Sequence, residues 1–206
     1  VQTCALPIFL PLPKLMAQCF ANAIPRREIR DEIIRQLEAF RLVTGHFPDF
    51  IDGHQHVQVL PVIRRALFEA LEVVKPDHKP WLHVPRDHLG SIMARGVSVG
   101  KALFISFLSL GFAQDAKRYR YRVNDTFSGV RSFDPDADFA QEFHRFLLVH
   151  GRRHLVMCHP GRSDATLAAL DPVTTARDQE FEFFNSDQFA KSLQAFSMRV
   201  SRFDEI

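Results

Sequence analysis

The stretch Ile51–Pro61, IDGHQHVQVLP, carries the densest group of metal-ligating side chains in the chain. Its apolar start predicts a short strand, and its closing proline predicts the first turn of a helix. Between them, Asp52, His54 and His56 stand at every second position. If the strand continues through the motif, its alternation places all three side chains on one side. We therefore expect a metal site immediately after this strand.

Two imidazoles and a carboxylate suit a divalent ion such as zinc, or a harder ion if further oxygen ligands join them. A working metal site usually has at least three protein ligands. The alternative is a polar strand end whose histidines are satisfied by ordinary hydrogen bonds. We favour the metal because the carboxylate, the paired histidines and the preceding strand occur together.

Outside this stretch, helical and strand-like segments alternate along the chain. This alternation predicts an α/β fold with a parallel sheet and helical crossovers, in a single domain over residues 9–206. Polar motifs follow three of the expected strands, as at the carboxyl rim of a barrel of parallel strands, where active sites lie. The expected helices cover 25–43, 98–116 and segments starting at 61, 134, 174 or 175, and 186; the expected strands lie at 50–51, 81–84, near 122 or 127–130, 154–158 and 198–203.

His159 follows an apolar strand and precedes Pro160-Gly161, a pair that turns the chain sharply. An imidazole presented at a strand end can act as a general acid or base, because its ordinary pKa lies near neutrality. The alternative is a loop histidine bonded to the backbone. The neighbouring Cys158 is interpreted as a buried small hydrophobic residue rather than a nucleophile.

Several further polar residues are candidates for contacts with the metal ligands or the substrate, each with a plainer alternative. Arg86 with Asp87 is equally typical of a surface ion pair, and Asn124 with Asp125 of a turn. Arg177 is spaced to pair with Glu180 on one helix. The candidate set is His56, Arg86, Asp87, Asn124, Asp125 and Arg177.

The overall charge is +2 over 206 residues, with both signs interspersed, which argues against a nucleic-acid partner. Lys117–Arg122 alternates cations with tyrosines, and we interpret it as a solvated helix end rather than a surface for single-stranded nucleic acid. The nearly apolar run Ala102–Ala113 is too short to span a bilayer, so we expect no integral membrane segment.

Three cysteines form no disulfide framework, and no secretory signal is recognisable, so we expect a cytoplasmic protein. The first eight residues, VQTCALPI, equal the translation of one frame of a widely used sequencing adapter. We interpret residues 1–8 as a sequence scar and expect that an N-terminal segment is missing.

Three motifs together resemble the YdjC-like carbohydrate deacetylases, which include chitooligosaccharide deacetylases and members associated with hopanoid biosynthesis. They are Ile51-Asp-Gly-His-Gln-His-Val, Val156-Met-Cys-His-Pro-Gly, and Asp171-Pro-Val with Arg177, Glu180 and Ser186. The resemblance runs from about residue 25 to the C-terminus. It implies a variant (β/α) barrel of the glycoside hydrolase/deacetylase type, and a hydrolase that removes N-acetyl groups from an amino sugar or from glycolipid-linked N-acetylglucosamine.

The resemblance also implies a divalent metal, usually magnesium, with zinc or another transition metal left open. His54 matches the metal-binding histidine, Asp52 and His56 match neighbouring motif residues, and His159 matches the histidine of the late motif. We take Asp52 and His159 as the candidate catalytic residues of this chain, with His159 protonating the leaving amine. Gln58 stands where many members have another histidine.

The motifs Asn-Ala-Asp-Asp-Phe-Gly and Gly-x-His, which open the family's sequences and supply further metal ligands, are absent here. We therefore expect an incomplete barrel that lacks its N-terminal strand or strands, binds metal weakly and has little activity. Two alternatives stay open: another HxH metal-dependent barrel hydrolase of the amidohydrolase or phosphoesterase type, and a non-catalytic carbohydrate-binding protein. Homo-oligomerisation also stays open.

Overall fold

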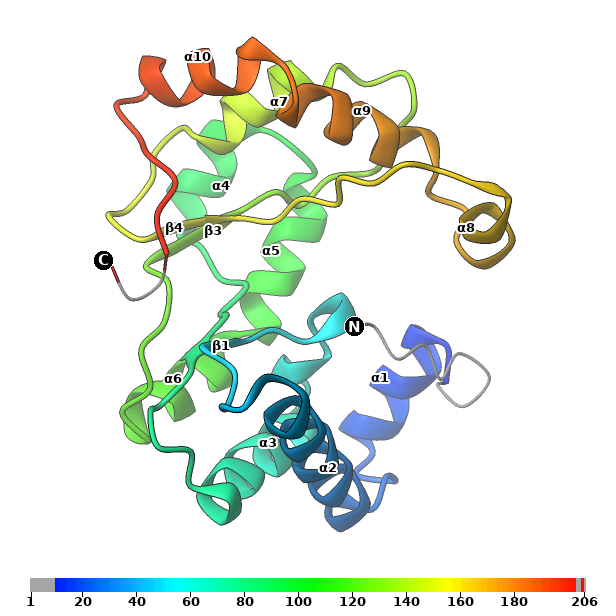
Figure 1. Cartoon of the computed structure of the whole chain (residues 1–206), viewed down its shortest axis with the longest axis vertical. Coiled ribbons are helices and arrows are strands. Elements are labelled where there is room, and N and C mark those ends of the chain that lie inside the picture. The colour runs from blue at the N-terminus through cyan, green and yellow to red at the C-terminus, as the bar shows by residue number, and fades with distance from the viewer. Residues whose placement is uncertain (1–9, 203–204, 206) are drawn as a thin grey trace. The chain divides into compact units, whose positions relative to one another are not determined.

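The computed structural model describes residues 10–202 and 205, so the expected scar at residues 1–8 lies outside the described part. The chain divides into two compact units (Figure 1). Unit 1 comprises Val1–Val84 and Leu108–Val123, and unit 2 comprises Pro85–Phe107 and Asn124–Ile206. The motif with Asp52 lies in unit 1 and the motif with His159 lies in unit 2, so each unit is described by itself.

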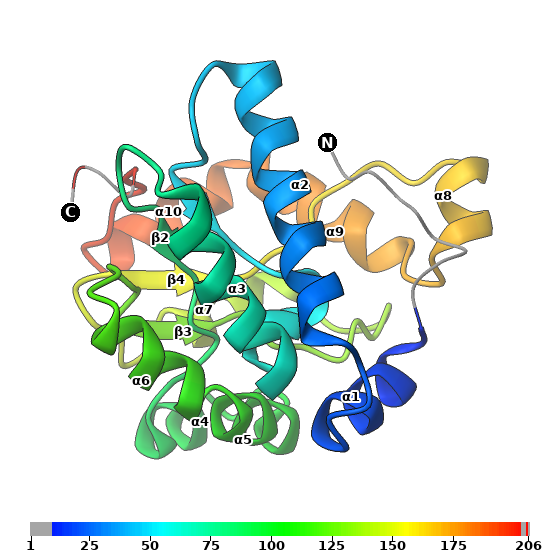
Figure 2. The same cartoon turned by 90° about the horizontal axis from the view of Figure 1, so that it is seen from below.

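Unit 1 is built around the long helix α2, which packs along α3 (Figures 1 and 2). Helix α2 ends at Thr44 and is capped by Gly45. The positive φ of Gly45, 84°, suits a residue without a side chain, and its N–H donates to the Arg41 carbonyl at 2.8 Å. The elements of this unit are α1 (Leu12–Phe20), α2 (Arg26–Thr44), β1 (Phe50–Ile51), the 3-10 segment η1 (His54–Val59), α3 (Pro61–Val74), β2 (Trp81–Leu82) and α6 (Leu110–Arg118).

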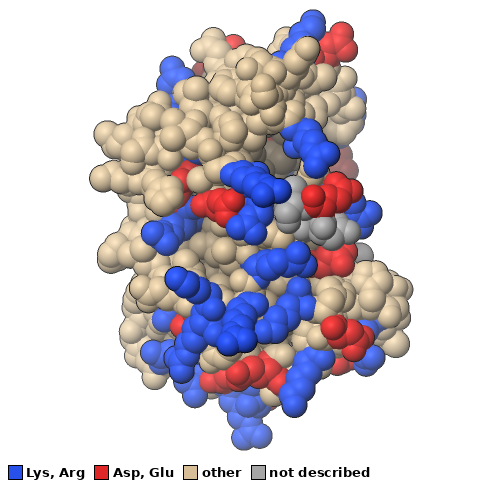
Figure 3. All heavy atoms as spheres, turned by 90° about the vertical axis from the view of Figure 1, so that its left-hand side faces the viewer, with Lys and Arg blue, Asp and Glu red and all other residues tan. Residues whose placement is uncertain are grey.

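The core of unit 1 is aromatic and aliphatic, and the basic run Lys117–Arg122 contributes to it. Tyr119 stacks on the buried Phe68 at 4.8 Å between ring centroids, and Lys79 and Arg122 lie over the rings of Tyr121 and Trp81. The aromatic rings of the run thus take part in the packing of unit 1. Figure 3 shows lysine and arginine side chains gathered on one face with acidic side chains among them.

Unit 2 holds a second sheet and a cluster of phenylalanines contributed by its helices. The rings of Phe139 and Phe143 on α7 pack against Phe183 on α9 at 5.2 and 4.9 Å between centroids, with all three side chains buried. Its elements are α4 (Leu89–Arg95), α5 (Val99–Leu108, whose last residue is counted in unit 1), β3 (Thr126–Ser128), α7 (Phe139–Phe146), β4 (His154–Val156), α8 (Ala165–Leu170), α9 (Thr175–Phe184) and α10 (Asp187–Ala195).

Both sheets are parallel, as the alternation of strands and helices predicts. Strand β1 pairs with β2 in unit 1, and β3 pairs with β4 in unit 2. The described residues form these two short sheets and no closed barrel, so the barrel expectation is not confirmed. A closed barrel needs an unbroken ring of paired strands, whereas these strands are only two or three residues long.

Several helix and strand boundaries differ from those expected. The helix expected over 98–116 is divided at Ser109 into α5 and α6. The helix expected from residue 134 begins at Phe139, because the carboxylate of Asp138 caps it by accepting from the Gln141 N–H at 3.2 Å. The described residues of 198–203 contain no strand. None of the described helices is both long enough and apolar enough to cross a membrane.

Candidate functional site

Asp52, His56 and His83 form the one group of metal-ligating side chains identified among the described residues of the chain. One ligand atom from each lies within 4.8 Å of the other two. The Nδ1 of His83 is 2.8 Å from Oδ1 of Asp52, and the rings of His56 and His83 meet edge to face at 5.5 Å between centroids. All three residues belong to unit 1.

The register of the β1–β2 pair brings Asp52 and His83 together. Phe50 pairs with Trp81 and Ile51 with Leu82, so Asp52 and His83 are the next residues of two parallel strands. The backbone N–H of His83 donates to the Ile51 carbonyl at 3.0 Å and continues the ladder by one step. Carboxyl ends of parallel strands meet at one edge of a sheet, which is where these side chains lie.

His56 reaches the group through a turn rather than through a continued strand, so the period-two expectation for the motif is wrong. Gln55 and His56 both have positive φ values, 52° and 59°, inside η1. The reversal leaves His54 exposed and outside the group formed by the described residues. The assignment of His54 as a metal ligand stays a prediction from the resemblance.

Gln58 and Gly53 lie next to the metal-ligating group, and Gln58 forms hydrogen bonds with Asp52 and His83. The buried Gln58 donates from Nε2 to Oδ1 of Asp52 and to the His83 carbonyl, both at 3.3 Å, and so links the two strand ends. A Cβ atom at residue 53 would overlap Oε1 at the end of the Gln58 side chain, so a larger residue there would require this side chain to shift. The amide of Gln58 therefore performs a structural task in the position where many family members carry histidine.

Asp52 is held in its ionised form. Burial alone would raise the pKa of its carboxyl group, but the hydrogen bond from His83, the charges of His83 and His56 and the backbone N–H of Gly53 outweigh burial and lower it. At neutral pH the group therefore offers one anionic oxygen and two imidazole rings.

This donor set fits a divalent transition metal. One carboxylate oxygen with two imidazole nitrogens is a common set of three protein ligands for zinc, whereas magnesium prefers oxygen ligands. Ligand atoms around tetrahedral zinc are roughly 3.3 Å apart, as follows from bond lengths near 2.0 Å. The 2.8 Å between Asp52 and His83 therefore needs to open only slightly to admit an ion. The donor set is consistent with a divalent metal ion.

His159 lies in unit 2, directly after β4, and its backbone is fixed by a buried carboxylate. The His159 N–H donates to Oε2 of Glu180, and Oε1 of Glu180 accepts from Nη1 of Arg131 at 3.1 Å. Glu180 and Arg131 are both fully buried. The i, i+3 pairing expected between Arg177 and Glu180 is therefore replaced: Glu180 pairs with Arg131, while Arg177 binds Asp171 at 2.6 Å.

The imidazole of His159 lies among cations. Burial lowers its pKa most, and the positive charges of Arg177, Lys101 and Arg131 lower it further, while Asp171 acts in the opposite direction. Its Nδ1 is buried and has no hydrogen-bond partner among the described residues. A neutral ring with an unused nitrogen is suited to taking up a proton and passing it on.

A second histidine of unit 2, His154, has a structural setting between β3 and β4. Its Nδ1 is 2.7 Å from the Thr126 hydroxyl, and its Nε2 is 2.9 Å from both the Ser128 hydroxyl and the Phe146 carbonyl. Burial, followed by the charge of Arg95, lowers its pKa to about 4. The ring is therefore neutral at physiological pH.

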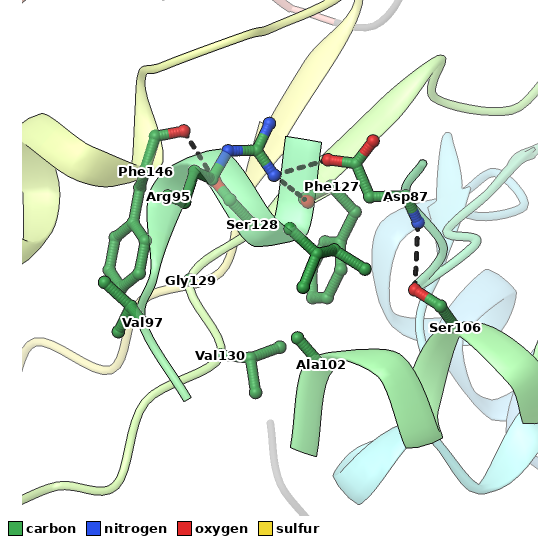
Figure 4. Close-up of a pocket in the computed structure, with 11 residues that line it drawn as sticks. Asp87, Arg95, Val97, Ala102, Ser106, Phe127, Ser128, Gly129, Val130 and Phe146 are labelled. Atoms are coloured by element: carbon green, nitrogen blue, oxygen red, sulfur yellow. Dashed lines mark hydrogen bonds and ion pairs between the residues drawn. The ribbon is translucent and has the colours of Figure 1, made fainter. Parts of the chain in front are cut away.

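Asp87 is a buried structural residue rather than part of a surface ion pair. It pairs with Arg95, and its backbone N–H donates to Oγ of Ser106 at 3.0 Å (Figure 4). The pair borders a cavity of about 20 Å³. Arg86, its neighbour, is exposed.

The remaining candidates have local partners. The side-chain amide of the buried Asn124 donates to the Thr126 carbonyl at 3.2 Å. Asp125 forms an ion pair with Arg153 at 2.6 Å, and the hydrogen bonds from Arg153 lower the pKa of its carboxyl group. Through these contacts, Asn124 binds to the start of β3, and Asp125 binds to the residue before β4.

His83 is the site residue that the sequence reasoning missed. A usable signal was present, because Trp81–Val84 is predicted as a strand and Asp52 follows another predicted strand. Parallel pairing of those two strands makes a polar residue at the end of the second a candidate partner for Asp52.

Comparison with known proteins supports the resemblance. Residues 4–195 match the YdjC-like protein family. Proteins named carbohydrate deacetylase are similar over short segments: 44% identity over 52 residues in Mus musculus and in Homo sapiens, and 39% over 59 residues in Xenopus laevis. These segments cover 25%, 25% and 29% of this chain, but only 17%, 16% and 18% of the respective relatives.

No solved structure matches the chain significantly. The family match nevertheless covers nearly the whole sequence, including the strand-end motif with Asp52 and His56 and the turn with His159. The chain therefore belongs to the YdjC-like protein family.

Proposed function

We propose that this chain is part of a carbohydrate deacetylase, a hydrolase that cleaves the amide bond of an N-acetylated amino sugar. The observation that carries the proposal is the group Asp52, His56 and His83, which combines an ionised carboxylate with two imidazoles at the ends of parallel strands. The family match and the names of the similar proteins support the same chemistry.

We propose that Asp52, His56 and His83 hold a divalent metal ion, with zinc or a related ion favoured by the donor set and magnesium favoured by the family resemblance. A metal bound by such ligands acts as a Lewis acid and lowers the pKa of bound water. The chain's own residues supply the orientation. Gln58 fixes the carboxylate of Asp52, and the strand ladder fixes His83.

His159 is the proposed proton donor to the leaving amine. Amide hydrolysis forms a bond from water oxygen to the acetyl carbon and breaks the bond from that carbon to nitrogen, so the nitrogen must gain a proton. With its lowered pKa, His159 is neutral at neutral pH and must take up a proton before donating it. The same low pKa makes the protonated ring a better donor.

Release of acetate tests the activity. Because the similar segments cover less than a fifth of the curated relatives, two proteins are compared: the 206-residue chain, and the same chain preceded by the N-terminal segment of a YdjC-like relative. N-acetylglucosamine oligomers and a glycolipid-linked N-acetylglucosamine serve as substrates. We expect metal-dependent acetate release from the extended protein and little from the chain alone. Absence of release from the extended protein with zinc, manganese or magnesium would refute the proposed function.

Calorimetric titration of the 206-residue chain with zinc tests the ligands. We expect His56→Ala and His83→Ala each to weaken binding by at least roughly tenfold, because each removes a ligand rather than a supporting group. His78→Ala is the control, since this exposed histidine of unit 1 lies outside the group. If His54→Ala abolishes binding while His83→Ala does not, the assignment from the resemblance holds and the geometric one fails.

A further inference from the structure

Phe133, in the segment after β3, has a backbone conformation that is rare for a bulky residue. Its φ is 62°, in the left-handed region that favours glycine. The chain is anchored on both sides of it. Arg131 is buried and bound to Glu142 and Glu180, and the Pro135 carbonyl accepts from Nε2 of Gln179 at 2.6 Å. Strain of this kind persists where the surroundings enforce it, and it is concentrated at functional sites.

The ring of Phe133 lies against the ring of His159. The centroids are 5.0 Å apart, and the planes are nearly perpendicular, at 83°. Nζ of Lys101 lies 5.5 Å from the centroid of the Phe133 ring, and the guanidinium carbon of Arg131 lies 5.7 Å from it. Lys101 also donates to the Arg131 carbonyl at 3.1 Å, which ties α5 to this segment. Lys101 and Arg131 thus both form cation–π interactions with the Phe133 ring.

His159 is therefore held by two residues of unit 2, one that contacts its backbone and one that contacts its imidazole. Glu180 accepts from its backbone N–H, and Phe133 packs against its imidazole. Gly129 allows the segments that follow β3 and β4 to approach each other closely. At its φ of 97°, any Cβ would overlap the carbonyl oxygen of Met157, just before the His159 turn. The strands β3 and β4 accordingly end with their following segments in direct contact.

We propose that Phe133 is a positioning residue for His159: its ring fixes the orientation of the imidazole and shields it from water, and the strained backbone keeps the ring in place. The inference rests on the proposed role of His159 as proton donor. It adds a residue that no catalytic motif in the sequence indicates.

The test is a histidine titration followed by nuclear magnetic resonance on the full 206-residue chain, with the signal of His159 assigned from His159→Gln. Phe133→Gly removes the ring and relieves the backbone. We expect the titration midpoint of His159 to rise by roughly half a pH unit or more, because water gains access to the charged form. The charged and titratable groups around the ring stay in place: Lys101 on α5, Arg131, Cys158, Asp171, and Arg177 and Glu180 on α9.

Ser197→Gly is the matched control, since it also places glycine at a positive φ, 53°, on an exposed residue of unit 2. We expect the titration of His159 to be unchanged by it. A folded Phe133→Gly protein in which His159 titrates as in the parent overturns the proposal. If the glycine variant does not fold, Phe133→Ala decides by the same titration, because it also removes the ring: the midpoint of His159 should rise, and an unchanged midpoint overturns the proposal.

This measurement uses neither substrate nor metal, so it separates the positioning role from the proposed function. In an extended protein that releases acetate, Phe133→Gly is expected to lower kcat by about tenfold with little change in KM, because orientation acts on the chemical step. A shifted titration in a protein without deacetylase activity would uphold the contact and refute only the function.

Discussion

Replacing Arg95 with leucine is expected to lower the free energy of unfolding by about 3–5 kcal/mol. The side chains of Arg95 and Asp87 are only 4% and 2% exposed, so the leucine leaves an uncompensated buried carboxylate. It also removes the donors to the carbonyls of Phe127, Leu148 and Val149, which Arg95 reaches at 2.9, 2.8 and 2.9 Å. Urea denaturation at neutral pH measures the effect.

Arg162→Leu is the control for this substitution, because the ion pair of Arg162 with Glu182 is 70% and 66% exposed and spans 3.3 Å. Exposed pairs contribute about 1 kcal/mol or less. Adding Asp87→Asn to Arg95→Leu should recover part of the loss, since the buried charge is then removed. An Arg95→Leu protein within about 1 kcal/mol of the parent would contradict the structural role of this pair.

Acid is expected to destabilise unit 2 through His154. Its pKa is lowered to about 4 in the fold, against an ordinary value near 6.5 when unfolded, so the folded state favours the neutral ring. The resulting stability is fully present above about pH 6.5 and is lost as the pH falls toward 4, because the unfolded chain then binds the proton more readily. The loss amounts to at most about 3 kcal/mol, since part of the ring is exposed.

His154→Gln tests this by urea denaturation at pH 7 and at pH 4.5. The variant should be less stable than the parent at pH 7 but lose less stability on acidification. Ser128→Ala is the matched control: it removes a hydroxyl 2.9 Å from Nε2 and keeps the titrating ring, so its acid sensitivity should remain. Equal acid dependence of the parent and His154→Gln would exclude His154 as the cause.

Local patterns predicted one long helix of this chain closely. The apolar face and the closing glycine placed α2 within one residue at each end, because both signals are contained in neighbouring residues. The group around Asp52 depends on something no local pattern contains, namely which strand lies beside β1 and in which register. His83 was overlooked for that reason, although its strand was expected.

The geometry of the histidine motif shows a second limit of sequence patterns. A spacing of two residues indicates one face only while the backbone stays extended. At Gln55 and His56 the backbone turns into the left-handed region, so His56 joins the group and His54 does not. The residue types do not predict this turn, because neither glutamine nor histidine requires a left-handed backbone conformation.

Glu180 has a consequence for the order of events during synthesis. It follows His159 by 21 residues and Arg131 by 49, yet it accepts hydrogen bonds from both. The histidine turn is therefore synthesised before the carboxylate that holds it. Until α9 has docked, Arg131 lacks one of its carboxylate partners and His159 lacks its backbone anchor, so this site is completed late, after the segments that contain its reactive groups have been made.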